Sequence, residues 1–228
     1  MKITVIYGQN HKGSTYHIAR MLAQKLGGEI TEFFLPRDFG EFCVGCNSCF
    51  LKSETLCPHY QKLLPIRQAM DEADVLIFAS PVYVYHVTGA MKAFLDHFGY
   101  RWMVHRPEAS MFHKQAVCVS TAAGAGMSHT NKDIADSLFF WGVGKVYTCG
   151  IRVKQVSYDL VSEEVKAQAD RETTALAQKI LRRHGKVQPG LKTRLFFEVM
   201  RRMQGLTEND RLYWQQQGWN GKKRPWKE

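Results

Sequence analysis

The sequence predicts an α/β protein built on one doubly wound, five-stranded parallel sheet. Two observations lead to this fold class: apolar, β-branched runs alternate five times with helical patterns, and no internal repeat or low-complexity segment interrupts them. The 228 residues are 45% hydrophobic and 23% charged, which is the balance of a globular chain with one sizeable core. We expect one α/β domain over residues 1–185 and an extension over residues 186–228.

Each expected strand is a short apolar run rich in β-branched or aromatic residues. The five runs are residues 2–8, 29–35, 74–85, 115–121 and 145–153. Helical spacing of apolar residues is found over residues 14–28, 63–73, 89–100, 131–142 and 162–185. In the first helix, Ser14 or Thr15 is suited to cap the N-terminus, and Gly27 and Gly28 end it.

In doubly wound sheets, ligands lie beyond the carboxyl ends of the strands, near the point where the strand order reverses. The loops after the first, third and fourth strands are therefore the candidate site. The first loop, "GQNHKGST" (8–15), lacks both the Walker pattern and the Gly-x-Gly-x-x-Gly pattern. Its hydroxyls and free amide groups at a helix N-terminus suit one terminal phosphate, to which His11 and Lys12 add positive charge. The alternative is a simple helix start after a turn.

The second and third loops offer surfaces to a planar ligand. In "SPVYVYHVTG" (80–89), Pro81 stiffens the strand exit, and Tyr83 and Tyr85 offer flat faces, unless the strand continues and buries both rings. In "STAAGAGMSHT" (120–130), small residues and two glycines allow the backbone to approach a ligand closely. Together the loops supply a phosphate seat, an aromatic wall and a bare backbone rim, as flavin mononucleotide (FMN) requires.

These three motifs match, in order and spacing, the FMN loops of the flavodoxin-like NADPH-dependent FMN reductase family, which the chain resembles over roughly residues 1 to 180. "SPVYVYHVTGAMKAFLD" is the most specific piece. The resemblance implies a strand order of 2-1-3-4-5. It also implies that Gln9, His11, Ser14 and Thr15 hold the phosphate, that Pro81, Val82, Tyr83 and Val84 line the ring, and that Thr121, Ala122, Gly124 and Gly126 face its other edge. Relatives often carry Ser-Pro-Arg where this chain has Gln9-Asn10-His11, so His11 stands in for the arginine.

Four of the six cysteines fall within fifteen residues. Cys43, Cys46, Cys49 and Cys57 have the spacing C-x2-C-x2-C-x7-C, with a proline after the last. This pattern resembles the compact cysteine motif of iron–sulfur flavoproteins, a branch of the same family, and would then bind a [4Fe-4S] cluster. Many relatives keep nearly the same spacing without a cluster, so a structural or redox-active loop, zinc and a disulfide stay open. Cys118 and Cys149 lie inside apolar strands and are expected in the core.

The extension carries most of the excess charge. The net charge of the chain is +10, and residues 186–228 hold ten Lys or Arg against four Asp or Glu. Five apolar residues in the first part of the extension have helical spacing and would form one apolar face: Leu195, Phe196, Val199, Met200 and Met203. A membrane-surface helix and a nucleic-acid patch are the alternatives to a helix packed on the body or on a second subunit, and the packed helix is favoured over both. No membrane span, no signal peptide and no nucleic-acid partner are expected, which favours the cytoplasm.

The expected function is that of an FMN-dependent NAD(P)H oxidoreductase, in a homodimer or larger homo-oligomer. The expected acceptor is a small molecule such as a quinone, a nitro or azo compound, or free flavin. The alternative is an electron carrier with a cluster on residues 43–57 that accepts electrons from ferredoxin. His86 and His129 border the expected ring, although ordinary loop histidines are the simpler interpretation. No catalytic residue follows from the sequence, because the cofactor carries the chemistry.

Overall fold

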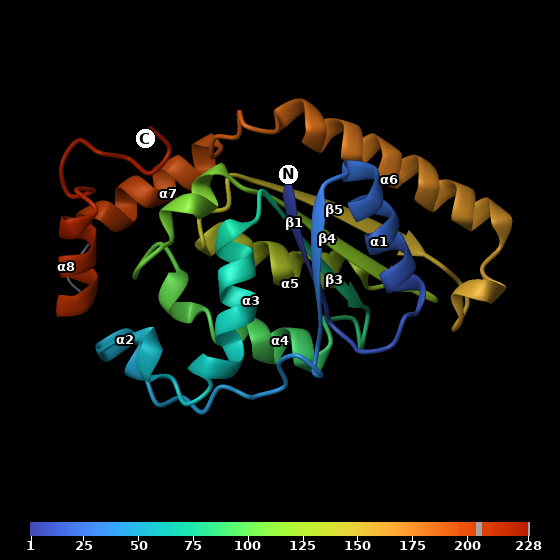
Figure 1. Cartoon of the computed structure of the whole chain (residues 1–228), viewed down its shortest axis with the longest axis horizontal. Helices are drawn as coiled ribbons and strands as arrows, with labels where there is room; N and C mark the ends of the chain where they lie inside the picture. The colour runs from blue at the N-terminus through green and yellow to red at the C-terminus, as the bar shows by residue number, and fades with distance from the viewer. Residues whose placement is uncertain (204–206, 228) are drawn as a thin grey trace.

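A computed structural model describes residues 1–203 and 207–227 and has the expected architecture (Figure 1). Five parallel strands form one sheet in the order β2-β1-β3-β4-β5, which confirms the predicted fold class and strand order. The strands are β1 (Lys2–Tyr7), β2 (Glu29–Phe34), β3 (Val75–Pro81), β4 (Gln115–Ala122) and β5 (Lys145–Arg152). The principal helices are α1 (Ser14–Leu26), α3 (Tyr60–Glu72), α4 (Gly89–Asp96), α5 (Met127–Phe140) and α6 (Glu163–Arg183).

Helices cover both faces of the sheet because successive residues of the strands point to opposite sides and both sets are apolar. In β3, Val75 and Ile77 pack with α1 and α6, whereas Leu76 and Phe78 pack with α3, α4 and α5. Figure 1 shows α1 and α6 together on one side of the sheet. This alternation leaves only the strand ends and their loops free to carry a site.

Three predicted boundaries are wrong in ways that matter for function. The strand expected over residues 74–85 ends at Pro81, and a tight turn follows. The helix expected from residue 131 already begins at Met127, directly after the third loop. The capping role predicted for Ser14 or Thr15 is also wrong: the N-cap residue of α1 is Gly13, and both hydroxyl residues lie buried in the first turn.

The C-terminal extension forms a smaller core beside the main one. Helices α7 (Leu191–Arg202) and α8 (Glu208–Gln216) bring Phe197 against Trp214, with ring centroids 4.8 Å apart, and against Phe112 of the body at 5.5 Å. Trp219 and Trp226 complete this cluster. The predicted packing of the extension on the body is therefore found.

The predicted apolar face of the extension is only partly the buried one. Met200 is buried and Phe196 is half-buried, but Leu195, Val199 and Met203 are exposed. Phe197, one position away from the predicted stripe, faces the body instead. The reason is that the tryptophans of the last thirty residues surround Phe197 and fix the rotation of α7. No helix among residues 1–203 and 207–227 is long and apolar enough to cross a membrane.

Candidate flavin and cysteine sites

The three predicted loops converge at the carboxyl edge of the sheet. Thr15 from the first loop and Thr121 from the third share a hydrogen bond of 2.6 Å between their hydroxyl oxygens. The hydroxyl of Tyr83 in the second loop donates to Oε1 of Gln9 in the first at 3.0 Å. A Cβ atom on Gly126 would lie 2.6 Å from Cγ1 of Val82, so the third loop touches the second through a bare backbone. Residues more than one hundred positions apart thus form one surface.

The start of α1 is prepared for an anion. Its first turn contains no acidic residue and its N-cap has no side-chain hydrogen bond, so the N-terminal amide groups keep their positive field. The hydroxyl oxygen of Ser14 is buried and has no hydrogen-bond partner among the described residues. His11 is exposed and lies 3.0 Å from Gln9, between Nε2 atoms of the two side chains. A buried hydroxyl without a partner costs free energy unless a ligand supplies the bond.

The second loop is a strained turn. Backbone hydrogen bonds of 2.9 and 3.0 Å join Tyr83 and His86 in both directions. The two residues between them have positive φ angles, 49° at Val84 and 68° at Tyr85. A β-branched residue in the left-handed region is an outlier, and such strain gathers at binding sites. Val84 is 93% exposed, and both tyrosines are exposed, so the interpretation that these side chains fill the core is wrong.

The remaining loop residues form the sides of this surface. Pro81, Val82 and Ala122 are half-buried, Thr121 is buried, and Gly124 is exposed with open space where a side chain would stand. Val82 also donates its amide hydrogen to the carbonyl of Thr121 at 3.0 Å, which fixes the second loop to β4.

A histidine–aspartate pair beside the second loop was not predicted. Nδ1 of His86 lies 3.0 Å from Oδ2 of Asp133, and the amide of Val87 donates to the same oxygen at 3.3 Å. Because a carboxylate can only accept, Nδ1 carries the proton and Nε2 is left free for another partner. His129 lies near, with its ring centroid 6.2 Å from that of His86. The partner of His86 is 47 residues away on α5, and no local pattern indicates it.

The four clustered cysteines lie on one side of the body, around the short helix α2 (Ser48–Leu51). Cys43 and Cys46 are exposed, whereas Cys49 and Cys57 are half-buried, and all six cysteines of the chain are free thiols. Burial, and then the nearby thiols of Cys57, Cys43 and Cys46, raise the pKa of Cys49. The other three clustered thiols therefore lie near enough to Cys49 to act on its ionisation.

The two other thiols belong to the core, as predicted. Cys118 and Cys149 are buried in β4 and β5, and burial raises the pKa of the Cys149 thiol to about 12. Neither thiol is poised for redox or metal chemistry.

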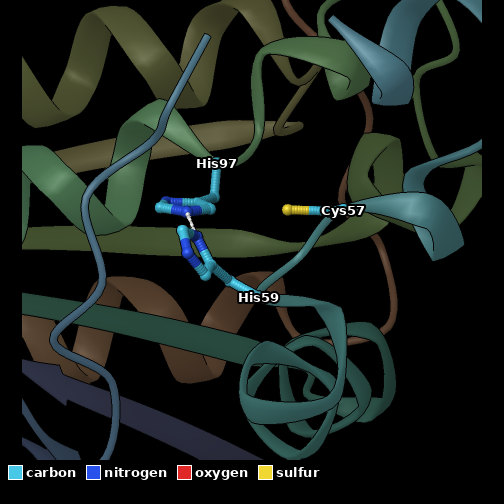
Figure 2. A group of neighbouring side chains, drawn as sticks. All are labelled: Cys57, His59 and His97. Atoms are coloured by element: carbon cyan, nitrogen blue, oxygen red, sulfur yellow. Dashed lines mark hydrogen bonds between the residues drawn. The ribbon is translucent and has the colours of Figure 1, made fainter. Parts of the chain in front are cut away.

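Two histidines that the sequence analysis did not single out stand next to Cys57 (Figure 2). One ligand atom of each of Cys57, His59 and His97 lies within 4.8 Å of the others. Nδ1 of His59 is 2.9 Å from Nε2 of His97, and Nδ1 of His97 is 2.7 Å from the carbonyl oxygen of Ala93. Burial lowers the pKa of His97 and so favours the neutral form of its ring.

Arg106, which lies between α4 and β4, and helix α8 of the extension hold the cysteine segment in place. Arg106 donates to the carbonyl oxygens of Cys49 and Phe50, the latter at 3.3 Å, and pairs with Asp210 of α8 at 2.8 Å. Asp210 is fully buried and also lies 2.8 Å from Nδ1 of His105. Asn209 donates to the carbonyl oxygen of Lys52 at 3.0 Å. The spacing of the cysteines gives no sign of these partners.

The fold and the converging loops define a flavodoxin-like α/β protein with its site at the carboxyl edge of the sheet. The model of the family described as NADPH-dependent FMN reductase matches residues 1–149. The chain therefore belongs to the NADPH-dependent FMN reductase family, which is the class of oxidoreductase that the loops predicted.

Curated relatives share shorter segments. An iron–sulfur flavoprotein of Archaeoglobus fulgidus is 30% identical over 99 residues, which cover 42% of this chain and 48% of that protein. An iron–sulfur flavoprotein of Methanocaldococcus jannaschii is 29% identical over 99 residues, covering 42% of this chain and 50% of that one. The chain thus matches about half the length of these relatives.

Solved structures share the fold at low sequence identity. An FMN-dependent NADH-azoreductase from Bacillus anthracis, solved with FMN, has a TM-score of 0.57 and 11% identity, covering 79% of this chain and all of that one. An NADH:FMN oxidoreductase in its apo form has a TM-score of 0.54 and 20% identity, covering 84% of this chain and 92% of that one. At these identities the likeness concerns the fold.

Proposed function

We propose that the chain is an FMN-dependent NAD(P)H oxidoreductase that passes electrons from reduced nicotinamide to a small acceptor such as a quinone, a nitro or azo compound, or free flavin. One observation carries this proposal: three loops from distant parts of the chain meet around the N-terminus of α1, where Ser14 keeps a buried hydroxyl without a partner. Family membership supports the same chemistry.

The residues present fit FMN. Ser14 would donate to the phosphate together with Thr15 and the amide groups at the start of α1, and His11 would stand where relatives use arginine. Gln9 is held by Tyr83 at the junction of the phosphate seat and the ring wall. The half-buried Pro81 and Val82 and the exposed Tyr83 and Val84 would line the ring, while Ala122, Gly124 and Gly126 leave room for its other edge.

When bound, FMN would supply the hydride and electron chemistry, and the chain would supply position and protons. The strained turn from Tyr83 to His86 fixes the aromatic wall before any ligand arrives. Asp133 holds His86 with its proton on Nδ1, so the Nε2 lone pair would be able to take a proton from water and pass it to an acceptor at the edge of the site. Reduction of a quinone or an azo bond consumes protons as well as electrons. The role of the pair of His86 and Asp133 would be to deliver such a proton to the acceptor.

The test is a visible spectrum of the purified chain, followed by reconstitution with FMN and by turnover with NADH or NADPH. We expect flavin bands and acceptor-dependent consumption of the nicotinamide. A protein that remains colourless at saturating FMN would contradict the proposal.

An iron–sulfur flavoprotein that takes electrons from ferredoxin is the second candidate function. It is supported by the effect of the neighbouring Cys43, Cys46 and Cys57 thiols on the pKa of Cys49 and by the names of the curated relatives. Anaerobic reconstitution with iron and sulfide should then give four iron atoms and four sulfides per chain, the content of one [4Fe-4S] cluster. A Cys46→Ser variant that keeps the same content would exclude four-thiolate ligation.

A further inference from the structure

The group formed by Cys57, His59 and His97 has the donor chemistry of a mononuclear metal site. It combines one thiol and two imidazoles, the ligands that zinc and similar borderline-soft ions prefer. The three residues come from three different element ends. Cys57 follows the 3-10 turn η1 (Glu54–Leu56), His59 is the N-cap of α3, and His97 is the C-cap of α4. Figure 2 shows the thiol of Cys57 directed toward the two rings.

The far side of the His97 ring is already arranged as a metal-ligating histidine requires, and the far side of the His59 ring faces a carboxylate beyond hydrogen-bond distance. Nδ1 of His97 faces the carbonyl oxygen of Ala93, which can only accept, so Nδ1 carries the proton and Nε2 presents its lone pair. Nε2 of His59 lies 3.9 Å from Oε2 of Glu41. The ring of Phe39 packs edge-on against His97 at 4.8 Å and fixes its orientation. A carbonyl and a carboxylate are the usual outer partners of such imidazoles.

The distances need little adjustment. With Zn–N bonds of about 2.0–2.1 Å and a Zn–S bond of about 2.3 Å, a tetrahedral site has edges of roughly 3.3–3.6 Å between ligand atoms. The two imidazole nitrogens lie 2.9 Å apart, and all three ligand atoms lie within 4.8 Å of one another. Shifts of about an ångström, made mainly by the less buried Cys57 and His59, would complete the geometry around the fixed ring of His97.

We propose that Cys57, His59 and His97 bind one zinc-like transition metal ion through one thiolate and two imidazole nitrogens, with water in the fourth position. The ion takes the place of the proton now shared between the two rings. Binding releases one proton, from the thiol of Cys57, while the Nδ1 proton of His59 moves to Nε2 and faces Glu41. This proposal does not depend on the flavin. A metal ion bound here makes the thiolate of Cys57 unavailable to a four-thiolate cluster. The chain can therefore bind either this ion or the cluster, but not both.

The test uses the full chain, metal-free, with reduced thiols and under anaerobic conditions. Zn²⁺ alone is titrated against a chromophoric chelator, and the X-ray absorption of the zinc-loaded protein counts the ligands. We expect one zinc per chain, with one sulfur and two imidazole nitrogens in its first coordination sphere. Four sulfurs around the zinc, or no binding that competes with the chelator, would overturn the proposal.

Variants locate the ion. Glu41→Gln removes an outer partner and should weaken zinc binding by about 10- to 100-fold. Cys57→Ser and His59→Gln remove ligands and should weaken it further than Glu41→Gln does. Cys43→Ser and Cys46→Ser are matched controls, because they remove exposed thiols of the same segment, and should leave the affinity unchanged. Loss of zinc in Cys43→Ser together with retention in His59→Gln would sink the proposal even if every variant folds.

Discussion

The three candidate flavin loops (residues 8–15, 80–89 and 120–130) and the cysteine segment (residues 43–57) are held in place by different parts of the molecule. The loops leave the carboxyl ends of β1, β3 and β4, so the hydrogen bonds of the sheet already bring them together. The cysteine segment follows β2 at the sheet edge, and its helix α2 is fixed instead by Arg106, Asn209 and the buried Asp210. A site at strand ends is thus a direct product of the fold, whereas a site on a peripheral loop needs additional partners. Four substitutions test this difference.

The largest effect is expected from Asp210→Ala. This substitution leaves Arg106 buried without its carboxylate, and breaking a buried ion pair in this way costs about 3–5 kcal/mol of unfolding free energy. Urea unfolding measures this loss of free energy. Thiol labelling of Cys49 should also become faster, because Arg106 no longer holds the carbonyl oxygen of Cys49 in place. The control is Asp136→Ala, which breaks an exposed pair with Lys132 and should cost about 0.5 kcal/mol or less. Equal losses in the two variants would contradict the role of Asp210.

Gly126→Ala tests the contact between the second and third flavin loops. The residue has φ of 102°, and a Cβ atom there would lie 2.6 Å from Cγ1 of Val82. Strain of this kind costs about 1–3 kcal/mol, so both thermal stability and FMN affinity should fall. Gly124→Ala is the matched control, because nothing lies within 4 Å of the added atom. FMN affinity that falls equally in both variants would speak against a specific contact at Gly126.

Ser14→Ala tests the phosphate seat. A hydrogen bond to a charged group contributes about 1.5–3 kcal/mol, so FMN should bind roughly 10- to 100-fold more weakly. Riboflavin, which lacks the phosphate, should bind the variant and the original chain equally. Stability without ligand should not fall, because the hydroxyl has no partner to lose. Ser128→Ala, at an exposed position, is the control, and fluorescence titration measures the FMN and riboflavin affinities of all three proteins. A parallel loss for riboflavin would place Ser14 elsewhere in the site.

The smallest effect concerns the thiols themselves. A hydrogen bond from Ser48 lowers the pKa of Cys46, whereas burial raises the pKa of Cys49. At any pH below both pKa values, Cys46 therefore holds the larger thiolate fraction and should react faster with iodoacetamide. The difference should narrow as pH rises and both thiols ionise. Mass spectrometry of partly labelled protein measures the two rates, and Ser48→Ala should slow Cys46 alone. Faster labelling of Cys49 than of Cys46 at neutral pH would contradict this prediction.

The sequence predicted what depends on local pattern. Apolar runs such as residues 75–81 identified the strands, and small or hydroxyl residues after them identified the three loops. The sequence did not predict features that depend on contacts between residues far apart in the chain. Helix α1 starts at Gly13 without a side-chain cap, which leaves Ser14 turned inward, and helical spacing cannot show that orientation. The turn at Val84 places a β-branched residue at positive φ, against local preference.

The partners of the cysteine segment were beyond the sequence for the same reason. His97 is 38 residues from His59, and Asp210 is 104 residues from Arg106. Both pairs exist only because helices at the edge of the body end near the segment. Cys57 and His59 are neighbours in the sequence and could have been considered together, since mixed Cys and His ligands are common in metal sites.

The link between α8 and the cysteine segment has a thermodynamic consequence. Arg106 and Asn209 both donate hydrogen bonds to main-chain oxygens of the cysteine segment. Arg106 also pairs with Asp210 of α8, and Asn209 itself belongs to α8. A ligand that binds the segment would then also stabilise the docked position of α8, and by reciprocity the docked α8 would raise the affinity of the segment for that ligand by the same factor. The described part of the extension would thus stabilise the candidate metal site, although Cys57, His59 and His97 all belong to the body.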